Sequence, residues 1–170
     1  MLHERICRAL DGSDFTWEWI VVDDRSGDDT FSVLSSISAR DKRVKGVRLA
    51  RNAGSHVAIR CGMDQARGDC AVILASDGED PPEMILTLVE KWRSGVKTVW
   101  GEKAAPSDKG VGFKLGAAFY YYLLRQVAGI KSIPARGADM VLIDRRVIET
   151  LKLFKEGRAN VFALIGWMGF

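Results

Sequence analysis

The chain has 170 residues, of which 47% are hydrophobic and 28% are charged, and its net charge is only +3. These values describe one compact domain with a hydrophobic core and exclude a disordered tail, a collagen-like rod and a disulfide miniprotein. The small net charge gives no indication of a nucleic-acid-binding surface, so no nucleic-acid partner is expected. Three cysteines, Cys7, Cys61 and Cys70, lie far apart without Cys-x-x-Cys spacing. This spacing suggests neither a disulfide framework nor a zinc site, and it favours a reducing, cytoplasmic setting.

Short apolar strands alternate with amphipathic helices over the first 101 residues. Apolar and β-branched runs predict strands at 17–22, 44–49, 71–75 and 97–101. Helical spacing of apolar residues, together with capping residues or prolines at the start, predicts helices at 26–40, 55–66 and 81–92. Strands joined in this way form βαβ units, so the predicted class is α/β with a mostly parallel sheet flanked by helices.

Polar residues follow three successive predicted strands. Because ligands bind at the carboxyl ends of the strands in such sheets, we expect these residues to converge on one cleft. They are Asp23 and Asp24, then Arg51 and Asn52, then Asp77, Glu79 and Asp80.

The third of these segments, ASDGEDPPE at 75–83, places three carboxylates within four residues. Clustered carboxylates repel one another unless a cation neutralises them, and oxygen ligands at a strand end suit Mg²⁺ or Mn²⁺ held together with phosphates. The alternative is a solvated acidic turn before a helix, with Asp80 as the N-cap.

The two earlier segments suit a nucleotide. Asp23 and Asp24 can accept hydrogen bonds from a nucleobase or a ribose, although the same segment also reads as a turn. After Arg51 and Asn52 the next helix begins near Ser55, and a helix N-terminus favours a diphosphate. His56 lies near that start and is more simply interpreted as a packing or surface residue.

Four segments occur in a fixed order: VVDDRSGDDT, LARNAGSHVAIRCGMDQARGD, ASDGEDPPE and KWRSGVKTVWG. Together they resemble the inverting family 2 glycosyltransferases of the GT-A fold, most of all the polyprenyl-phosphate sugar transferases that are similar to dolichyl-phosphate-mannose synthase. The resemblance covers about residues 17–170. It implies a GT-A-type, Rossmann-like sheet in one domain, with a nucleotide-sugar-binding half at 1–101 and an acceptor or interface half at 102–170.

The resemblance also assigns roles to residues. Asp24 is expected to bind the base of a UDP- or GDP-linked sugar, with Asp23 supporting it and with Arg51 and Asn52 in the same site. Asp77 is expected to be the retained carboxylate of the family's Asp-x-Asp metal motif, whose first position is Ala75 here. The second metal ligand is expected at Glu79, where relatives usually carry Gln.

The acceptor side follows from the segment GADMVLIDRRV at 137–147, which resembles a Gly-Asp-Phe-Arg-Leu-x-x-Arg pattern. Asp139 matches the Asp, whereas Val141 replaces the Arg of the phosphate-handling region. The charge for an acceptor phosphate is then expected from Lys114, Arg136 and Arg145. A phosphate acceptor needs no strong general base, whereas a hydroxyl acceptor would need one, for which Asp80 and Asp139 are the candidates.

The resemblance implies transfer of a sugar, with inversion, from a nucleotide-sugar to polyprenyl phosphate at the inner face of the cytoplasmic membrane. One alternative is a soluble family 2 transferase with a saccharide acceptor, and another is an inactive domain that binds a nucleotide or a partner. Relatives begin with a strand before the first helix and continue into membrane helices, so we expect a chain shortened at both ends. An unfilled sheet position would also favour pairing between two copies.

Overall fold

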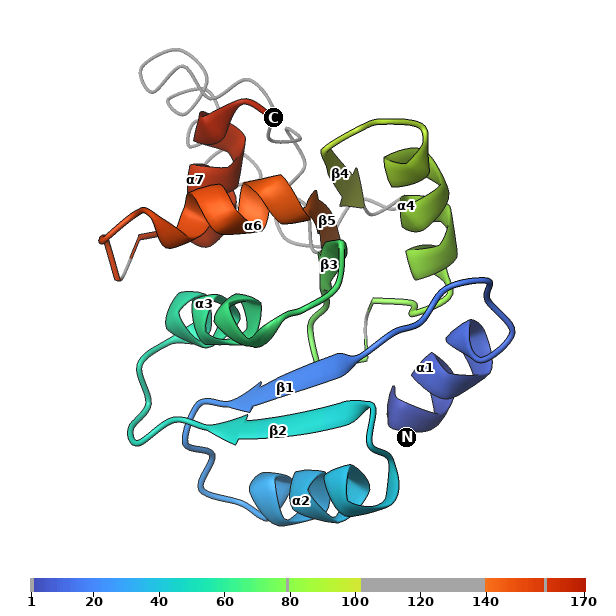
Figure 1. The fold of residues 1–170 in the computed structure, drawn as a ribbon. Helices are drawn as coiled ribbons and strands as arrows, with labels where there is room; N and C mark the ends of the chain where they lie inside the picture. Colours follow the sequence, from blue (N-terminus) through green and yellow to red (C-terminus); the bar gives the residue numbers. More distant parts are fainter. Residues whose placement is uncertain (1, 79, 102–139, 158) are drawn as a thin grey trace, which may run out of the picture.

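A computed structural model describes residues 2–78, 80–101, 140–157 and 159–170, and it confirms the α/β class (Figure 1). The elements follow in the order α1 (Leu2–Leu10), β1 (Trp19–Asp23), α2 (Thr30–Arg40), β2 (Val44–Arg48), α3 (Ser55–Gln65), β3 (Cys70–Ile73), α4 (Met84–Arg93), β4 (Thr98–Gly101), β5 (Met140–Asp144), α6 (Arg145–Lys152) and α7 (Val161–Met168). Residues 113–128, for which the sequence also predicts a largely apolar helix, lie outside the described residues. Within the described part, no helix has the length and apolar character needed to cross a membrane.

The strands form two separate sheets. β1 and β2 are parallel, in a register that places Asp23 opposite Arg48. The second sheet has the order β3-β5-β4, and β5 runs antiparallel to both neighbours. β3 and β4 therefore share a direction, as expected, while β5 is an antiparallel strand that the sequence analysis did not predict.

The core is built on the two faces of β5. Because side chains alternate along a strand, Val141 and Ile143 face one cluster and Met140 and Leu142 face the other. The first cluster receives α3, α6 and α7, and the second receives α4. All five residues of β5 are buried, so this strand holds helices on both sides of the second sheet.

α7 contributes to this core. Val161 and Ile165 are almost fully buried in the first cluster, whereas Trp167 is 59% exposed and Phe170 is 44% exposed. One side of α7 therefore packs in the core, whereas Trp167 on the helix and Phe170 just beyond its end are exposed.

A cavity of about 390 Å³ separates the two sheets. It is lined by both facing strands, β1 and β3, and by apolar residues of α1, α3 and α4, among them Ile6, Met63 and Val89. Within the described residues β1 pairs only with β2, and β3 pairs only with β5. The facing edges of β1 and β3 therefore have no strand between them in this part of the chain.

α3 begins at Ser55, as predicted, and its N-cap is Gly54, where the chain turns into the helix with φ = +96°. The start of α4 differs from the prediction. The N-cap of α4 is Glu83 rather than Asp80, since Pro81 and Pro82 form a separate turn whose carbonyls accept from the first backbone N–H groups of the helix.

Candidate active site

Asp23 ends β1 and is buried, with only 4% of its surface exposed. Its Oδ1 accepts a hydrogen bond of 2.9 Å from the Ser26 backbone N–H, and its Oδ2 lies 3.0 Å from Nε of Arg48 in an ion pair. The bonds from Ser26, helped by the charge of Arg48, hold the pKa of the Asp23 carboxyl below its usual value. Asp23 is therefore a charged anchor that fixes the turn after β1.

Arg48 ends β2 and belongs to a basic run at 42–48 whose sequence pattern is equally typical of a solvated strand edge, so the pattern alone did not indicate a role for it. Besides its ion pair with Asp23, its Nη2 donates to the Ser26 carbonyl at 2.8 Å. The signal that could have found it is the parallel register, which places the last residues of β1 and β2 side by side.

Next to this network, Arg25 has φ = +63°, the one positive φ outside glycine among the described residues. That strained conformation marks the loop after β1 as a candidate functional segment.

Asp24 joins the end of β1 to the start of α3. Its two carboxylate oxygens accept hydrogen bonds of 2.7 Å from the Ala53 N–H and 2.8 Å from the Gly54 N–H. The structure thus brings the first two predicted segments together, with Asp24 between them. The role of Asp24 toward a nucleobase stays a prediction. A nucleobase bound there would meet a carboxylate that already accepts hydrogen bonds from two backbone N–H groups.

Arg51 and Asn52 lie in the loop between β2 and α3, and both are exposed. Since Asp24 holds the next two residues, this loop is fixed at the carboxyl ends of β1 and β2. His56 accepts a hydrogen bond of 3.4 Å at Nδ1 from the Val161 N–H, and its ring meets that of Phe162 edge to face. The packing interpretation of His56 is confirmed.

The third predicted segment follows β3. Asp77 is exposed in the turn at 76–78, and Asp80 is buried at 5% exposure, with Oδ2 3.4 Å from the Ala75 N–H. Ser76 lines the cavity between the sheets together with Val22, the neighbour of Asp23. The third segment therefore reaches the cavity beside β1. Glu79 lies outside the described residues.

The predicted acceptor residues are only partly described. Arg145 begins α6, and its guanidinium donates to the carbonyls of Ala66 and Gly68. Its backbone N–H donates to the Asp69 carbonyl at 2.7 Å, just before β3 begins. Arg145 therefore lies at the amino end of β3, whereas Asp77 follows its carboxyl end, so the structure does not bring these two together. Lys114, Arg136 and Asp139 lie outside the described residues.

The arrangement can hold an anionic, polar ligand. Exposed Arg51 and Asn52 and the first turn of α3 supply donors, while Asp77 supplies an exposed carboxylate. Backbone N–H groups at a helix N-terminus favour phosphate groups, and carboxylate oxygens favour a hard divalent cation. This pairing of an anion site with a cation ligand suits a nucleotide diphosphate.

Comparison with known proteins gives a consistent result. The family model described as glycosyl transferase family 2 matches residues 1–152. A protein of Bacillus subtilis (strain 168) named uncharacterized glycosyltransferase YkcC is 34% identical over 99% of this chain and 52% of its own length. The bactoprenol glucosyl transferase of Shigella phage SfV is 30% identical over 89% of this chain and 49% of its own.

Among solved structures, a mannosyltransferase from Pyrobaculum calidifontis in complex with GDP-Man and Mn²⁺ superposes with a TM-score of 0.57. The two sequences are 23% identical, and the superposition covers 88% of this chain and 42% of the mannosyltransferase. This likeness concerns the fold alone. The chain spans about half the length of the curated relatives it matches.

Proposed function

This chain belongs to glycosyl transferase family 2 and has the GT-A-type α/β fold, and from that premise we propose that its protein transfers a sugar from a nucleotide-sugar to polyprenyl phosphate with inversion. The observation that carries the proposal is the similarity over 152 residues to a bactoprenol glucosyl transferase. Bactoprenol is a polyprenol, so the same acceptor class is proposed here.

The donor in this proposal is a UDP- or GDP-linked sugar. Support comes from the site built by Asp24, whose bonds to Ala53 and Gly54 hold the loop of Arg51 and Asn52 against the end of β1. The solved relative in the same fold binds GDP-Man with Mn²⁺. Arg51, Asn52 and the start of α3 would then bind the diphosphate, and the loop at 23–26 would meet the nucleoside.

A divalent cation, Mg²⁺ or Mn²⁺, fits the chemistry of the residues after β3. Asp77 is an exposed carboxylate in a tight turn at Gly78, where φ is +78°, and hard oxygen ligands are what these ions prefer. Asp77, and Glu79 as predicted from the sequence, would hold the ion. When bound, it would neutralise charge that develops on the leaving diphosphate.

In the reaction proposed, an acceptor oxygen forms a bond to the anomeric carbon of the sugar from the face opposite the diphosphate. The bond from that carbon to the diphosphate oxygen breaks, and the nucleoside diphosphate leaves. A polyprenyl phosphate is already anionic near neutral pH, so this chain need not supply a strong base. Asp80, buried next to the Ala75 N–H, and Asp139 are the bases we would assign only for a hydroxyl acceptor.

The acceptor places the reaction at a membrane surface, and we propose the inner face of the cytoplasmic membrane. Two exposed apolar residues, Trp167 on α7 and Phe170 just beyond its end, offer apolar contact area for that surface. Lys114 and Arg136 stay the proposed phosphate-binding residues of the acceptor half. Arg145 is the least suitable of the three candidates, because its guanidinium already donates hydrogen bonds to the carbonyls of Ala66 and Gly68, which follow α3.

Donor binding can be tested by thermal-shift titration with UDP, GDP and their sugars, with and without Mn²⁺. We expect a Mn²⁺-dependent rise in melting temperature for one nucleotide, since a ligand that binds only the folded state stabilises it. Asp77→Ala should abolish that rise. The matched control is Asp64→Ala, which removes an exposed carboxylate from α3 and should leave the rise intact.

The acceptor is tested separately, by incubating the chain with a radiolabelled nucleotide-sugar and either polyprenyl phosphate or an oligosaccharide. Label that enters the organic phase only with the lipid supports the proposal. Label that enters a water-soluble product identifies a saccharide acceptor instead. Nucleotide binding without transfer to either acceptor points to a binding domain.

A further inference from the structure

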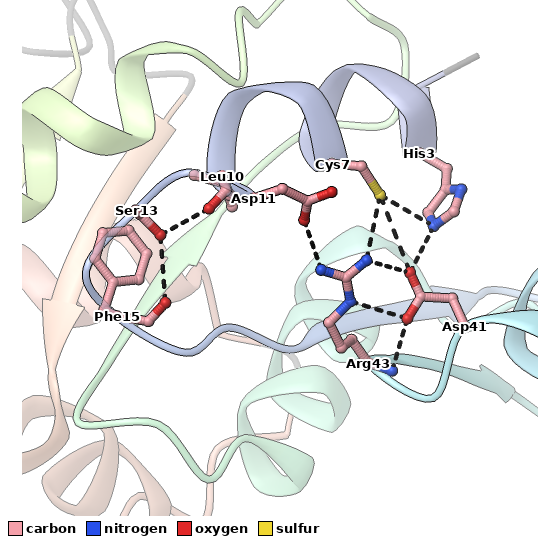
Figure 2. Close-up of polar contacts among 8 residues, drawn as sticks. All are labelled: His3, Cys7, Leu10, Asp11, Ser13, Phe15, Asp41 and Arg43. Atoms are coloured by element: carbon pink, nitrogen blue, oxygen red, sulfur yellow. Dashed lines mark hydrogen bonds and ion pairs between the residues drawn. The ribbon is translucent and has the colours of Figure 1, made fainter.

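We propose that the chain carries a zinc site, formed by His3, Cys7 and Asp41, that is separate from the site of the donor. His3 and Cys7 lie one turn apart on α1, and Asp41 is the C-cap of α2, shortly before β2 (Figure 2). Within the described ranges, this is the one group of three or more His, Cys, Asp and Glu side chains whose ligand atoms lie within 4.8 Å of one another.

Two of the three distances between the ligand atoms are close to those that a tetrahedral ion requires. His3 Nε2 lies 3.2 Å from Asp41 Oδ2 and 3.5 Å from Cys7 Sγ, and Sγ lies 4.0 Å from the same Oδ2. Bonds of about 2.0–2.3 Å to zinc at tetrahedral angles separate such atoms by roughly 3.3–3.6 Å. Closure of the Sγ to Oδ2 distance by a few tenths of an ångström would complete three corners, and water would supply the fourth.

Contacts outside the triad hold two of the ligands in place. The His3 ring stacks on Trp19 at 5.9 Å between centroids and 10° between planes. Asp41 accepts the Arg43 backbone N–H at Oδ1, at 3.0 Å, so that Oδ2 is the oxygen turned toward His3 and Cys7. Such supporting contacts orient the ligands of metal sites and reduce the cost of assembling them.

The local charge leaves room for a cation. Arg43 donates to Asp41 at 2.8 Å and to Asp11 at 2.6 Å, and these three groups carry a net charge of −1. Nη2 of Arg43 contacts both Asp41 Oδ2 and, at 3.7 Å, Cys7 Sγ, and zinc would replace it at these two atoms. Zinc binding would form a zinc–sulfur bond and release the Cys7 thiol proton to solvent, with the remaining imidazole proton of His3 on Nδ1. The charges of the zinc ion, the Cys7 thiolate, the carboxylates of Asp41 and Asp11 and the Arg43 guanidinium then sum to zero. Arg43 can keep Asp11 through Nη1 and Asp41 through Nε, at 3.0 Å to Oδ1.

The ligand types select zinc over the cation proposed for the donor. A thiolate and an imidazole suit Zn²⁺, whereas Mg²⁺ and Mn²⁺ prefer oxygen ligands. The place differs as well, because Asp41 precedes β2 and lies beside the amino ends of β1 and β2, while the predicted donor site lies at their carboxyl ends. Zinc would tie α1 to the end of α2 across the 34 residues that separate Cys7 from Asp41.

The test is metal analysis of the purified chain after loading with Zn²⁺ and removal of excess metal. We expect one zinc per chain, and a loss of zinc affinity of at least roughly tenfold in Cys7→Ser and in His3→Gln. The matched controls are Cys61→Ser and His56→Gln, which alter another half-buried cysteine and the other histidine. Both controls should keep the metal.

Cobalt gives a readout that does not depend on any variant. Co²⁺ in the wild-type chain should give a thiolate charge-transfer band and the strong visible bands of a tetrahedral ion, and Zn²⁺ should displace both. A wild-type chain without stoichiometric zinc, or a cobalt spectrum without the thiolate band, would overturn the proposal. Retention of zinc by Cys7→Ser would also overturn it, and so would a loss of zinc affinity in Cys61→Ser equal to that in Cys7→Ser. Nucleotide binding in Mn²⁺ is read in the same samples and does not bear on this outcome.

Discussion

The carboxylate of Asp24 accepts a 2.8 Å hydrogen bond from the backbone N–H of Gly54, although the two residues are 30 positions apart. This bond connects the end of β1 with the N-cap of α3, and with the Ala53 bond it uses both oxygens of Asp24. The loop that carries Arg51 and Asn52 is therefore positioned by one acidic side chain from the neighbouring strand.

Asp24→Asn should weaken both the loop and the nucleotide site. An amide offers one acceptor oxygen and would turn an NH₂ group toward one of the two backbone donors, so one partly buried hydrogen bond is lost. We expect a loss of about 1–3 kcal/mol of unfolding free energy and nucleotide affinity lowered at least tenfold. Urea denaturation and calorimetric titration measure the two effects. Asp64→Asn on α3 is the control, and equal losses in both variants would contradict the role given to Asp24.

Gly54→Ala tests the backbone conformation that begins α3. At φ = +96° a side chain is strained even though an added Cβ would meet no atom within 4 Å. We expect a loss of about 1–2 kcal/mol in unfolding free energy, from backbone strain alone. Gly27→Ala is the matched control, because Gly27 also has open space around it and its φ lies outside the left-handed region. Equal stability of the two variants would show that a side chain at position 54 does not strain the backbone.

Much of the first half of the fold was predictable because its signals are local. The helix predicted at 55–66 and the strands predicted at 44–49 and 97–101 were placed within one residue by apolar spacing and flanking polar residues, whereas the helix predicted at 26–40 begins four residues later, at Thr30. The carboxyl-end rule also predicted that Asp24 and the loop of Asn52 meet, which the hydrogen bonds to Ala53 and Gly54 confirm.

The features that were missed depend on contacts distant in the sequence. The four apolar residues at 140–143 could have indicated a buried strand, but not that it would insert antiparallel between β3 and β4. The placement of Arg145 against the carbonyls of Ala66 and Gly68 follows from that insertion. The cluster of His3, Cys7 and Asp41 has no spacing signature, because its third ligand comes from a different element.

Asp144 should make the stability of the second sheet depend on pH. Its carboxylate accepts from Trp92 Nε1 at 2.8 Å, from the Arg146 N–H at 3.0 Å and from Lys97 Nζ at 3.1 Å. Burial tends to raise the pKa of Asp144, but these donors outweigh it and hold the pKa below its usual value. Their contribution is therefore complete above the unfolded pKa of about 3.9 and is lost as the pH falls through the lower, folded value.

Asp144→Asn should accordingly cost about 1–3 kcal/mol at pH 7, and the difference from wild type should shrink as the pH falls below about 4. Urea denaturation at a series of pH values measures this. Glu149→Gln is the control, since its carboxylate is 53% exposed and exposed ion pairs contribute little. A difference for Asp144→Asn that is constant from pH 7 to pH 2 would contradict the electrostatic explanation.

Gly46 and Leu34 set the distance between β2 and α2. A Cβ on Gly46 would lie 2.8 Å from Cγ and 3.0 Å from Cδ2 of Leu34, which is buried. Gly46→Ala should therefore cost about 1–3 kcal/mol of unfolding free energy through overpacking, whereas Gly12→Ala, with nothing within 4 Å of the added atom, should cost little.

Leu34→Ala removes the clashing atoms and costs about 2–5 kcal/mol of unfolding free energy on its own. In the double variant the added methyl fills part of the space left by Leu34, so its loss should be smaller than the sum of the two single losses. Additive losses in a urea double-mutant cycle would mean that the strand and helix separate freely and that Gly46 is not needed for their close approach.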